Sequence, residues 1–207
     1  MPPVRYRVAG AWMLAALLAA AHVARAADTQ TIVMVRHGEK PAAGLGQLAC
    51  QGLNRALALP QVIHDRFGKP DAIFAPSPAQ SKRDHGIVYD YVRPLATIEP
   101  TAIRFGLPVN TQFGYAQTQA LVTQLEKPRY RTSLVVVAWE HVELVKIARA
   151  LLAGNGGDAS TVPAWHYDDF DGIYVVRIER DAKGAHAVFS RQIEGLDGQP
   201  EQCPGPP

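Results

Sequence analysis

A short basic segment follows an apolar run near the start of the chain. Arg36, His37 and Gly38 come directly after residues 31–35 (TIVMV). A guanidinium offers a fork of donors that matches phosphoryl oxygens, a neutral imidazole can attack phosphorus, and glycine lets a ligand approach the backbone. These residue types fit phosphoryl chemistry, although the segment alone is equally compatible with a loop that carries a surface histidine.

A second histidine has a similar position. His141 and the preceding Glu140 come shortly after residues 134–138 (LVVVA). Such runs are typical of buried parallel strands, and ligands of open α/β sheets bind at the carboxyl ends of those strands. We therefore expect His37 and His141 to meet at one edge of a sheet.

The rest of the chain alternates between strand and helix patterns. The expected strands are 31–35, 71–74, 96–98 and 134–138, the expected helices are 53–67, 81–92, 118–125 and 142–152, and 173–178 pairs with 186–191 as an edge hairpin. Pro60 is expected to split the first helix or to begin its second part. This order predicts an α/β, three-layer, doubly wound fold with a mostly parallel central sheet and helices on both faces.

The first 26 residues have the anatomy of a secretory signal peptide. Arg5 and Arg7 precede an apolar run over 9–21, and Ala24 and Ala26 provide small residues before a polar stretch. The run is short for a spanning helix, so we expect cleavage after Ala26 and export, with a periplasmic location, over the alternative of an uncleaved anchor. No repeat or linker divides residues 27–207, which we expect to form one domain.

Charge and cysteine content narrow the class of protein. The first 26 residues hold three of the 21 basic residues and no acidic one, which leaves 18 basic against 19 acidic residues. No basic stripe with aromatic residues remains, which argues against a nucleic-acid partner, and no later apolar stretch is long enough to span a bilayer. Cys50 and Cys203 fit one structural disulfide in an oxidising compartment, with two free thiols as the alternative.

Three ordered motifs carry a family resemblance. Residues 32–40 (IVMVRHGEK) resemble the first motif of the histidine phosphatase superfamily, the phosphoglycerate mutase-like or RHG-motif family. Residues 48–56 (LACQGLNRA) are similar to the segment that follows it, and residues 135–141 (VVVAWEH) are similar to the strand that carries the second histidine. The resemblance covers most of residues 31–153.

The remaining motif departs from the family pattern. The family usually reads Ser-x-x-x-Arg-x-x-x-Thr, but Ser81 stands four residues after Ser77. Residues 93–97 (RPLAT) match the Arg-x-x-x-Thr half, as though about a dozen residues were inserted after Ser77. We therefore predict that Arg93 is the second phosphate-binding arginine, with Arg83 as the alternative.

The resemblance implies a mechanism and a set of roles. His37 would take the phosphoryl group as a phosphohistidine that water cleaves, while Arg36, Arg93 and His141 surround the phosphoryl oxygens. The other ring nitrogen of His37 should then donate to a backbone carbonyl. No metal or other cofactor is implied, and the expected partner is a small phosphorylated substrate or inorganic phosphate.

The group that protonates the leaving oxygen is less evident. The two positions at which family members carry an acid are not acidic here, so Glu140 is the first candidate, followed by Glu143 and Glu39. A carboxyl in this role needs a raised pKa, and Glu140 could instead support the phosphate pocket. Glu39, Ser77 and His85 are expected to contribute to substrate binding.

These features together predict an exported, metal-independent phosphohydrolase that acts on a phosphomonoester or a similar phosphoryl compound. The alternative is a catalytically weak phosphate- or phosphosugar-binding protein of the same fold. Neither the substrate nor the oligomeric state follows from the sequence.

Overall fold

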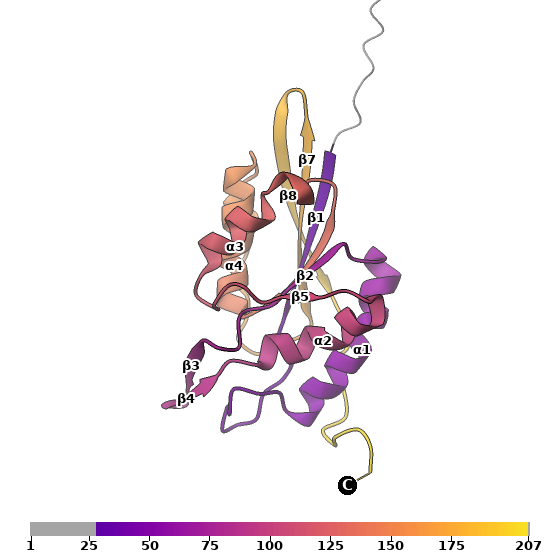
Figure 1. Ribbon diagram of the computed structural model, residues 1–207, viewed down its shortest axis with the longest axis vertical. Coiled ribbons are helices and arrows are strands. Elements are labelled where there is room, and N and C mark those ends of the chain that lie inside the picture. Colours follow the sequence, from indigo (N-terminus) through magenta and orange to yellow (C-terminus); the bar gives the residue numbers. More distant parts are fainter. Residues whose placement is uncertain (1–27, 207) are drawn as a thin grey trace, which may run out of the picture.

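Six strands form one mixed sheet in the computed structural model, which describes residues 28–206. Their order is β5-β2-β6-β1-β7-β8 (Figure 1). The parallel strands are β1 (Asp28–Arg36), β2 (Ala72–Phe74), β5 (Val109–Asn110) and β6 (Leu134–Trp139). The antiparallel hairpin of β7 (Gly172–Asp181) and β8 (Gly184–Ile193) extends the sheet beyond β1. The sequence predicts this hairpin and every parallel strand except β5.

Helices cover both faces of the sheet. One layer contains α1 (Cys50–Phe67) and α2 (Arg93–Phe105), and the other contains α3 (Thr118–Leu125) and α4 (His141–Gly154) (Figure 1). Two short 3₁₀ turns are η1 (Pro128–Tyr130) and η2 (Ala159–Thr161). In β1, Ile32 and Met34 pack with α3 and α4, whereas Val33 and Val35 pack with α1 and α2. This two-residue alternation of a strand buried on both faces confirms the predicted three-layer α/β fold.

The predicted helix over residues 81–92 is wrong. The segment forms a separate two-stranded hairpin, β3 (Ser81–Asp84) and β4 (Ile87–Asp90). His85 and Gly86 connect the strands, and both have positive φ, 48° and 86°. Two residues at positive φ make the tight turn whose twist suits a hairpin, which no helix can accommodate.

The predicted strand over residues 96–98 is also wrong, because these residues lie inside α2. The buried positions of α2 follow a helical period and are Arg93, Pro94, Thr97, Ile98, Thr101 and Ala102. A three-residue apolar stretch is too short to show whether its apolar positions repeat every two residues, as in a strand, or every 3.6 residues, as in a helix. In α1, Pro60 neither splits nor starts a helix, since the helix runs through it without interruption.

The C-terminal tail is fixed to the first helix. Cys50 and Cys203 form a disulfide, which confirms the predicted pairing. Next to it, the Asn54 amide nitrogen donates to the carbonyls of Pro200 and Gln202, each at 2.8 Å. The tail is therefore attached at the amino-terminal end of α1, close to the loop that carries the Arg-His-Gly motif.

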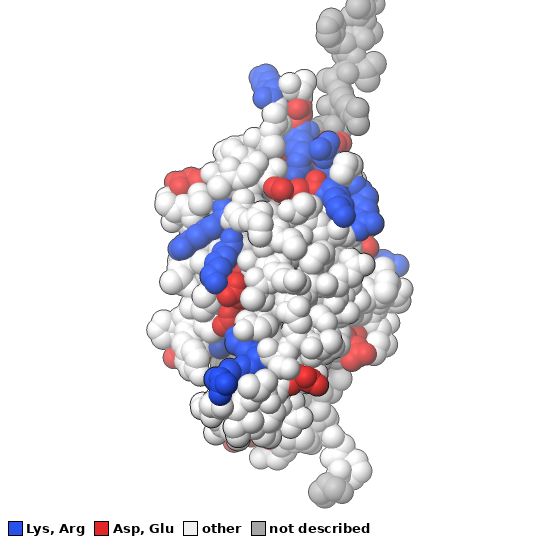
Figure 2. All heavy atoms as spheres, turned by 60° about the vertical axis from the view of Figure 1, so that its left-hand side comes forward, with Lys and Arg blue, Asp and Glu red and all other residues white. Residues whose placement is uncertain are grey.

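The predicted signal peptide lies outside the described residues. Among residues 28–206, no helix has the length and apolarity needed to cross a membrane. On the face shown in Figure 2, Lys and Arg lie in small separate groups with acidic side chains among them. The absence of a nucleic-acid partner stays a prediction.

Candidate active site

Two adjacent parallel strands deliver the two histidines to one edge of the sheet. Arg36 at the end of β1 is in register with Trp139 at the end of β6, and the His37 amide donates to the Trp139 carbonyl at 3.1 Å. His37 and His141 are both buried, with 3% and 9% of their surface exposed. Their positions follow from the two apolar runs, because parallel strands end at the same edge.

His37 is held as a neutral imidazole. Its Nδ1 donates to the Gly38 carbonyl at 2.8 Å, and because a carbonyl only accepts, the proton is on Nδ1 and the lone pair is on Nε2. Burial lowers the pKa of His37 to about 3, with Arg93 and Arg36 acting in the same direction against the Gly38 hydrogen bond. An unprotonated Nε2 is the form that can attack phosphorus.

Arg36 is fixed by one end of its guanidinium. Its Nη1 donates to the Tyr167 and Asp169 carbonyls at 2.6 and 2.8 Å, and Cζ lies 3.9 Å from the centroid of the Phe170 ring. These partners are neutral, so they orient the side chain without cancelling its charge. The buried Nε has no hydrogen-bond partner.

Arg93 begins α2 and is oriented in a similar way. Its Nη1 donates to Asp84 at 2.6 Å, and its buried Nε has no partner. One turn later, Thr97 accepts a hydrogen bond from the Gly38 amide at 3.0 Å, which ties α2 to the His37 loop. Arg83, the alternative second arginine, is exposed on the hairpin and donates to the Gly86 carbonyl.

Glu140 and His141 form a close pair at the start of α4. Glu140 Oε1 lies 2.8 Å from His141 Nδ1, but the two groups are poorly aligned for a hydrogen bond. Glu140 also caps the helix by accepting from the Glu143 amide at 3.0 Å. Burial raises the pKa of Glu140, but His141, Lys82 and the Glu143 amide outweigh it and lower the pKa to about 2. A carboxyl that donates a proton near neutral pH needs a raised pKa, so this environment does not suit Glu140 to that role.

Several residues at the site were missed by the sequence reasoning. Tyr91 is fully buried, with its ring edge-on to His37 at 6.1 Å between centroids, and Tyr167 stands edge-on to His141 at 6.0 Å. Lys82 lies on β3, where the sequence predicts a helix, and its Nζ is 3.9 Å from Glu140. The available signal was Gly86 followed by a β-branched and aromatic run at 87–89 (IVY), which is typical of a strand that begins after a turn.

Three predicted substrate-binding residues have other contacts. Glu39 accepts three hydrogen bonds from Arg55 Nε and Nη2, at distances down to 2.7 Å. His85 sits half-exposed at the hairpin turn. Ser77 is anchored by its backbone amide to the Phe113 carbonyl, and no side-chain hydrogen bond joins it to the site within residues 28–206.

Unpartnered buried donors concentrate at this site. Six buried side-chain polar atoms have no hydrogen-bond partner among the described residues, and four belong to the site: Arg36 Nε, Tyr91 Oη, Arg93 Nε and His141 Nδ1. A buried polar atom without a partner is destabilising and is rare in native proteins. Three of them, Arg36 Nε, Arg93 Nε and Tyr91 Oη, can donate to an anion with several oxygens, whereas His141 Nδ1 faces the Glu140 carboxylate at 2.8 Å.

Solved structures share this architecture, although no family model and no curated protein matches the sequence. Similar structures include a mycobacterial protein named hydrolase 2 (16% identity, 78% of this chain and 89% of that chain, TM-score 0.53). A mycobacterial glucosyl-3-phosphoglycerate phosphatase solved with inorganic phosphate has 16% identity over 78% of this chain and 95% of that chain (TM-score 0.52). A protein from Nakamurella multipartitia, provisionally named phosphohistidine phosphatase SixA, has 15% identity over 81% and 98% (TM-score 0.52). The chain has the histidine phosphatase fold.

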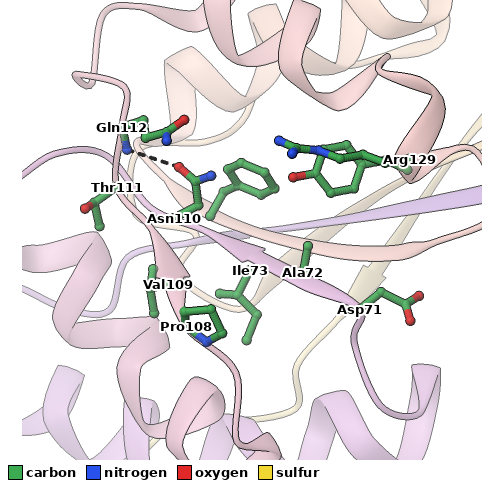
Figure 3. Close-up of a pocket in the computed structure, with 11 residues that line it drawn as sticks. Asp71, Ala72, Ile73, Pro108, Val109, Asn110, Thr111, Gln112 and Arg129 are labelled. Atoms are coloured by element: carbon green, nitrogen blue, oxygen red, sulfur yellow. Dashed lines mark hydrogen bonds between the residues drawn. The ribbon is translucent and has the colours of Figure 1, made fainter.

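A hollow of about 500 Å³ lies elsewhere on this histidine phosphatase fold. Ala72 and Ile73 of β2 and Pro108 and Val109 form its apolar floor, and Figure 3 shows Arg129 extending over it from the opposite side. None of the site residues described above lines it. Within residues 28–206, no group of three or more His, Cys, Asp or Glu side chains is arranged to hold a metal ion.

Proposed function

We propose that the chain is an exported phosphohydrolase that cleaves a small phosphomonoester through a phosphohistidine at His37. The observation that carries this proposal is the neutral, buried imidazole of His37 beside two arginines whose Nε groups have no partner. In both arginines Nη1 is anchored by the protein, which leaves the Nε side of each guanidinium for phosphoryl oxygens. The disulfide supports export, because such bonds persist in oxidising compartments.

The chain's own residues supply each step of this chemistry. Nε2 of His37 attacks phosphorus and the P–O bond to the leaving alcohol breaks, while Arg36, Arg93 and His141 stabilise the charge on the three equatorial oxygens. Water then attacks the phosphohistidine and releases phosphate. Glu140 is ionised beside His141, so its proposed role is to position that imidazole and not to donate a proton.

The test is phosphate release from 4-nitrophenyl phosphate by wild type and by His37→Ala. We expect wild-type turnover and a loss of on the order of 10³-fold or more in the variant, because covalent catalysis disappears with the imidazole. Rapid quenching of wild type should also trap an acid-labile phosphoenzyme that His37→Ala lacks. His64→Ala is the matched control, since His64 is an exposed residue of α1, and it should keep full activity.

Calorimetric titration with inorganic phosphate separates the enzyme from the binding protein. Equal inactivity of wild type and His37→Ala between pH 4 and 8, with phosphate bound by both, would show a binding protein and refute the hydrolase. Wild-type activity should not fall through protonation of His37 over this range, because the pKa of that imidazole is lowered to about 3.

A further inference from the structure

The β3–β4 hairpin brings a lysine to the site. Along β3, Lys82 and Asp84 face inward, whereas Ser81 and Arg83 face solvent. Asp84 fixes the hairpin because it accepts from Arg93 at 2.6 Å and from Lys40 at 2.9 Å. Since residues two apart share a strand face, this anchoring also directs Lys82 toward the site.

The Lys82 ammonium lies beside two aromatic rings that pack edge-to-face on each other, and near one carboxylate. Nζ is 5.1 Å from the Tyr91 ring centroid, 5.0 Å from that of Tyr115 and 3.9 Å from Glu140 Oε1. The side chain is 27% exposed. Its ion pair with Glu140 is loose and its ring contacts accept no proton, so the N–H donors of Lys82 are available to a ligand bound at the site.

The other candidate proton donors of this region fit less well. Glu140 is ionised and Glu39 is bound to Arg55. Residues 111–125, the segment of Tyr115, contain no carboxylate. Burial raises the pKa of Tyr91 above its ordinary value, which makes its phenol a weaker acid still.

We propose that Lys82 is the general acid that protonates the leaving oxygen, which extends the substrate class to phosphomonoesters of ordinary alcohols. This inference rests on the proposed phosphohydrolase function. As the bond from Nε2 of His37 to phosphorus forms and the P–O bond breaks, a proton passes from the Lys82 ammonium to the leaving oxygen and yields the alcohol. The neutral amine then takes a proton from the attacking water. The P–N bond breaks, its electron pair returns to Nε2, and phosphate leaves.

The electrostatic surroundings agree with this role. Burial lowers the pKa of Lys82, Arg93 from α2 lowers it further, and Glu140 and Glu143 from α4 and Asp84 from β3 raise it, with the balance below the ordinary lysine value. Tyr91 and Tyr115 are the remaining titratable groups that face it. A lysine with a lowered pKa gives up its proton more readily and recovers it in the second half-reaction.

The experiment compares two leaving groups in three variants. Wild type, Lys82→Ala, Lys82→Arg and the outward-facing control Arg83→Ala are assayed with 4-nitrophenyl phosphate, which needs no acid, and with glycerol phosphate, which does. Lys82→Ala should lose on the order of 10²-fold or more in kcat/KM for glycerol phosphate and less than about tenfold for 4-nitrophenyl phosphate. Lys82→Arg should be as defective as Lys82→Ala toward glycerol phosphate, because guanidinium keeps the charge but does not release a proton. Arg83→Ala should match wild type.

Four results would overturn the inference. Recovery of glycerol phosphate hydrolysis in Lys82→Arg would show that only the charge matters. Equal losses on both substrates in Lys82→Ala would show a binding role. Wild-type activity on 4-nitrophenyl phosphate that depends on His37, without any on glycerol phosphate, would refute the inference and leave the proposed function standing. Inactivity of wild type on both substrates would refute both.

Discussion

Two buried arginines, Arg36 and Arg55, adjoin the loop that carries His37, and their hydrogen-bond partners are of opposite kinds. Arg36 donates only to backbone carbonyls and lies against aromatic rings, whereas Arg55 donates to four carboxylates: Glu39, Asp171, Glu194 and Asp197. All three nitrogens of the Arg55 guanidinium are used, while the Nε of Arg36 has no partner. Arg36 keeps both its charge and a nitrogen for a substrate anion, whereas the charge of Arg55 is balanced by carboxyl groups and all its nitrogens are occupied, so Arg55 holds the structure.

Arg55 and its four carboxyl partners, together the Arg55 cluster, pack against the loop that carries His37. Gly38 and Gly52 pack so closely that a Cβ added to Gly38 would lie 2.9 Å from the Gly52 Cα. Arg55 follows one helical turn after Gly52 and holds Glu39, the residue after Gly38. The cluster also ties in Asp171 and Glu194 from the two ends of the β7–β8 hairpin. Its function is therefore to fix the loop from which His37 projects.

The largest effect on stability is expected at Arg55. Arg55→Ala leaves the carboxylates of Glu39 and Asp171 without their cation and the buried carboxyl of Glu194 without its donor, which should lower the free energy of unfolding by about 3–5 kcal/mol. Asp197→Asn, which removes the partner whose side chain is 77% exposed, should change it by less than about 1 kcal/mol. Denaturation in urea, followed by circular dichroism, measures both. Similar values for the two variants would contradict the distinction between the arginines.

The same comparison predicts an activity effect at Arg36. Arg36→Lys keeps the charge but loses the planar fork, one part of which binds the carbonyls and the other the phosphoryl group. Phosphate release should fall on the order of 10²-fold while the free energy of unfolding changes by no more than about 1 kcal/mol. A variant with wild-type turnover and a clear loss of stability would show that Arg36 is structural, as Arg55 is.

The positions of the two histidines could be predicted from the sequence, whereas the contacts of Arg55 could not. His37 and His141 could be predicted because each follows a long β-branched run, and parallel strands end together. Arg55 could not, because its four partners come from residues 39, 171, 194 and 197, whose proximity follows only from the completed fold. Lys82 was misplaced for a local reason: the turn at His85 and Gly86 lacks the usual Asn-Gly or Asp-Gly pair, so the hairpin resembled a helix.

The remaining prediction concerns the pH dependence of stability, and it arises in the Arg55 cluster. Burial, reinforced by Asp171 and Glu39, outweighs Arg55 and raises the pKa of Glu194 from 4.5 to about 8. Between these values the unfolded chain releases this proton and the folded chain keeps it, so Glu194 makes stability fall as pH rises. The slope is at most about 1.4 kcal/mol per pH unit.

Glu194→Gln should remove this slope. The amide keeps the shape of the protonated carboxyl and carries no titratable proton, so the difference in unfolding free energy between wild type and variant should shift in favour of the variant as pH rises from 4.5 to 8. Urea titrations at intervals of half a pH unit measure that difference, with Glu201→Gln on the exposed tail as the control that leaves the slope unchanged. A constant difference across the range would mean that Glu194 is ionised in the folded protein, and that Arg55 alone balances all four carboxylates.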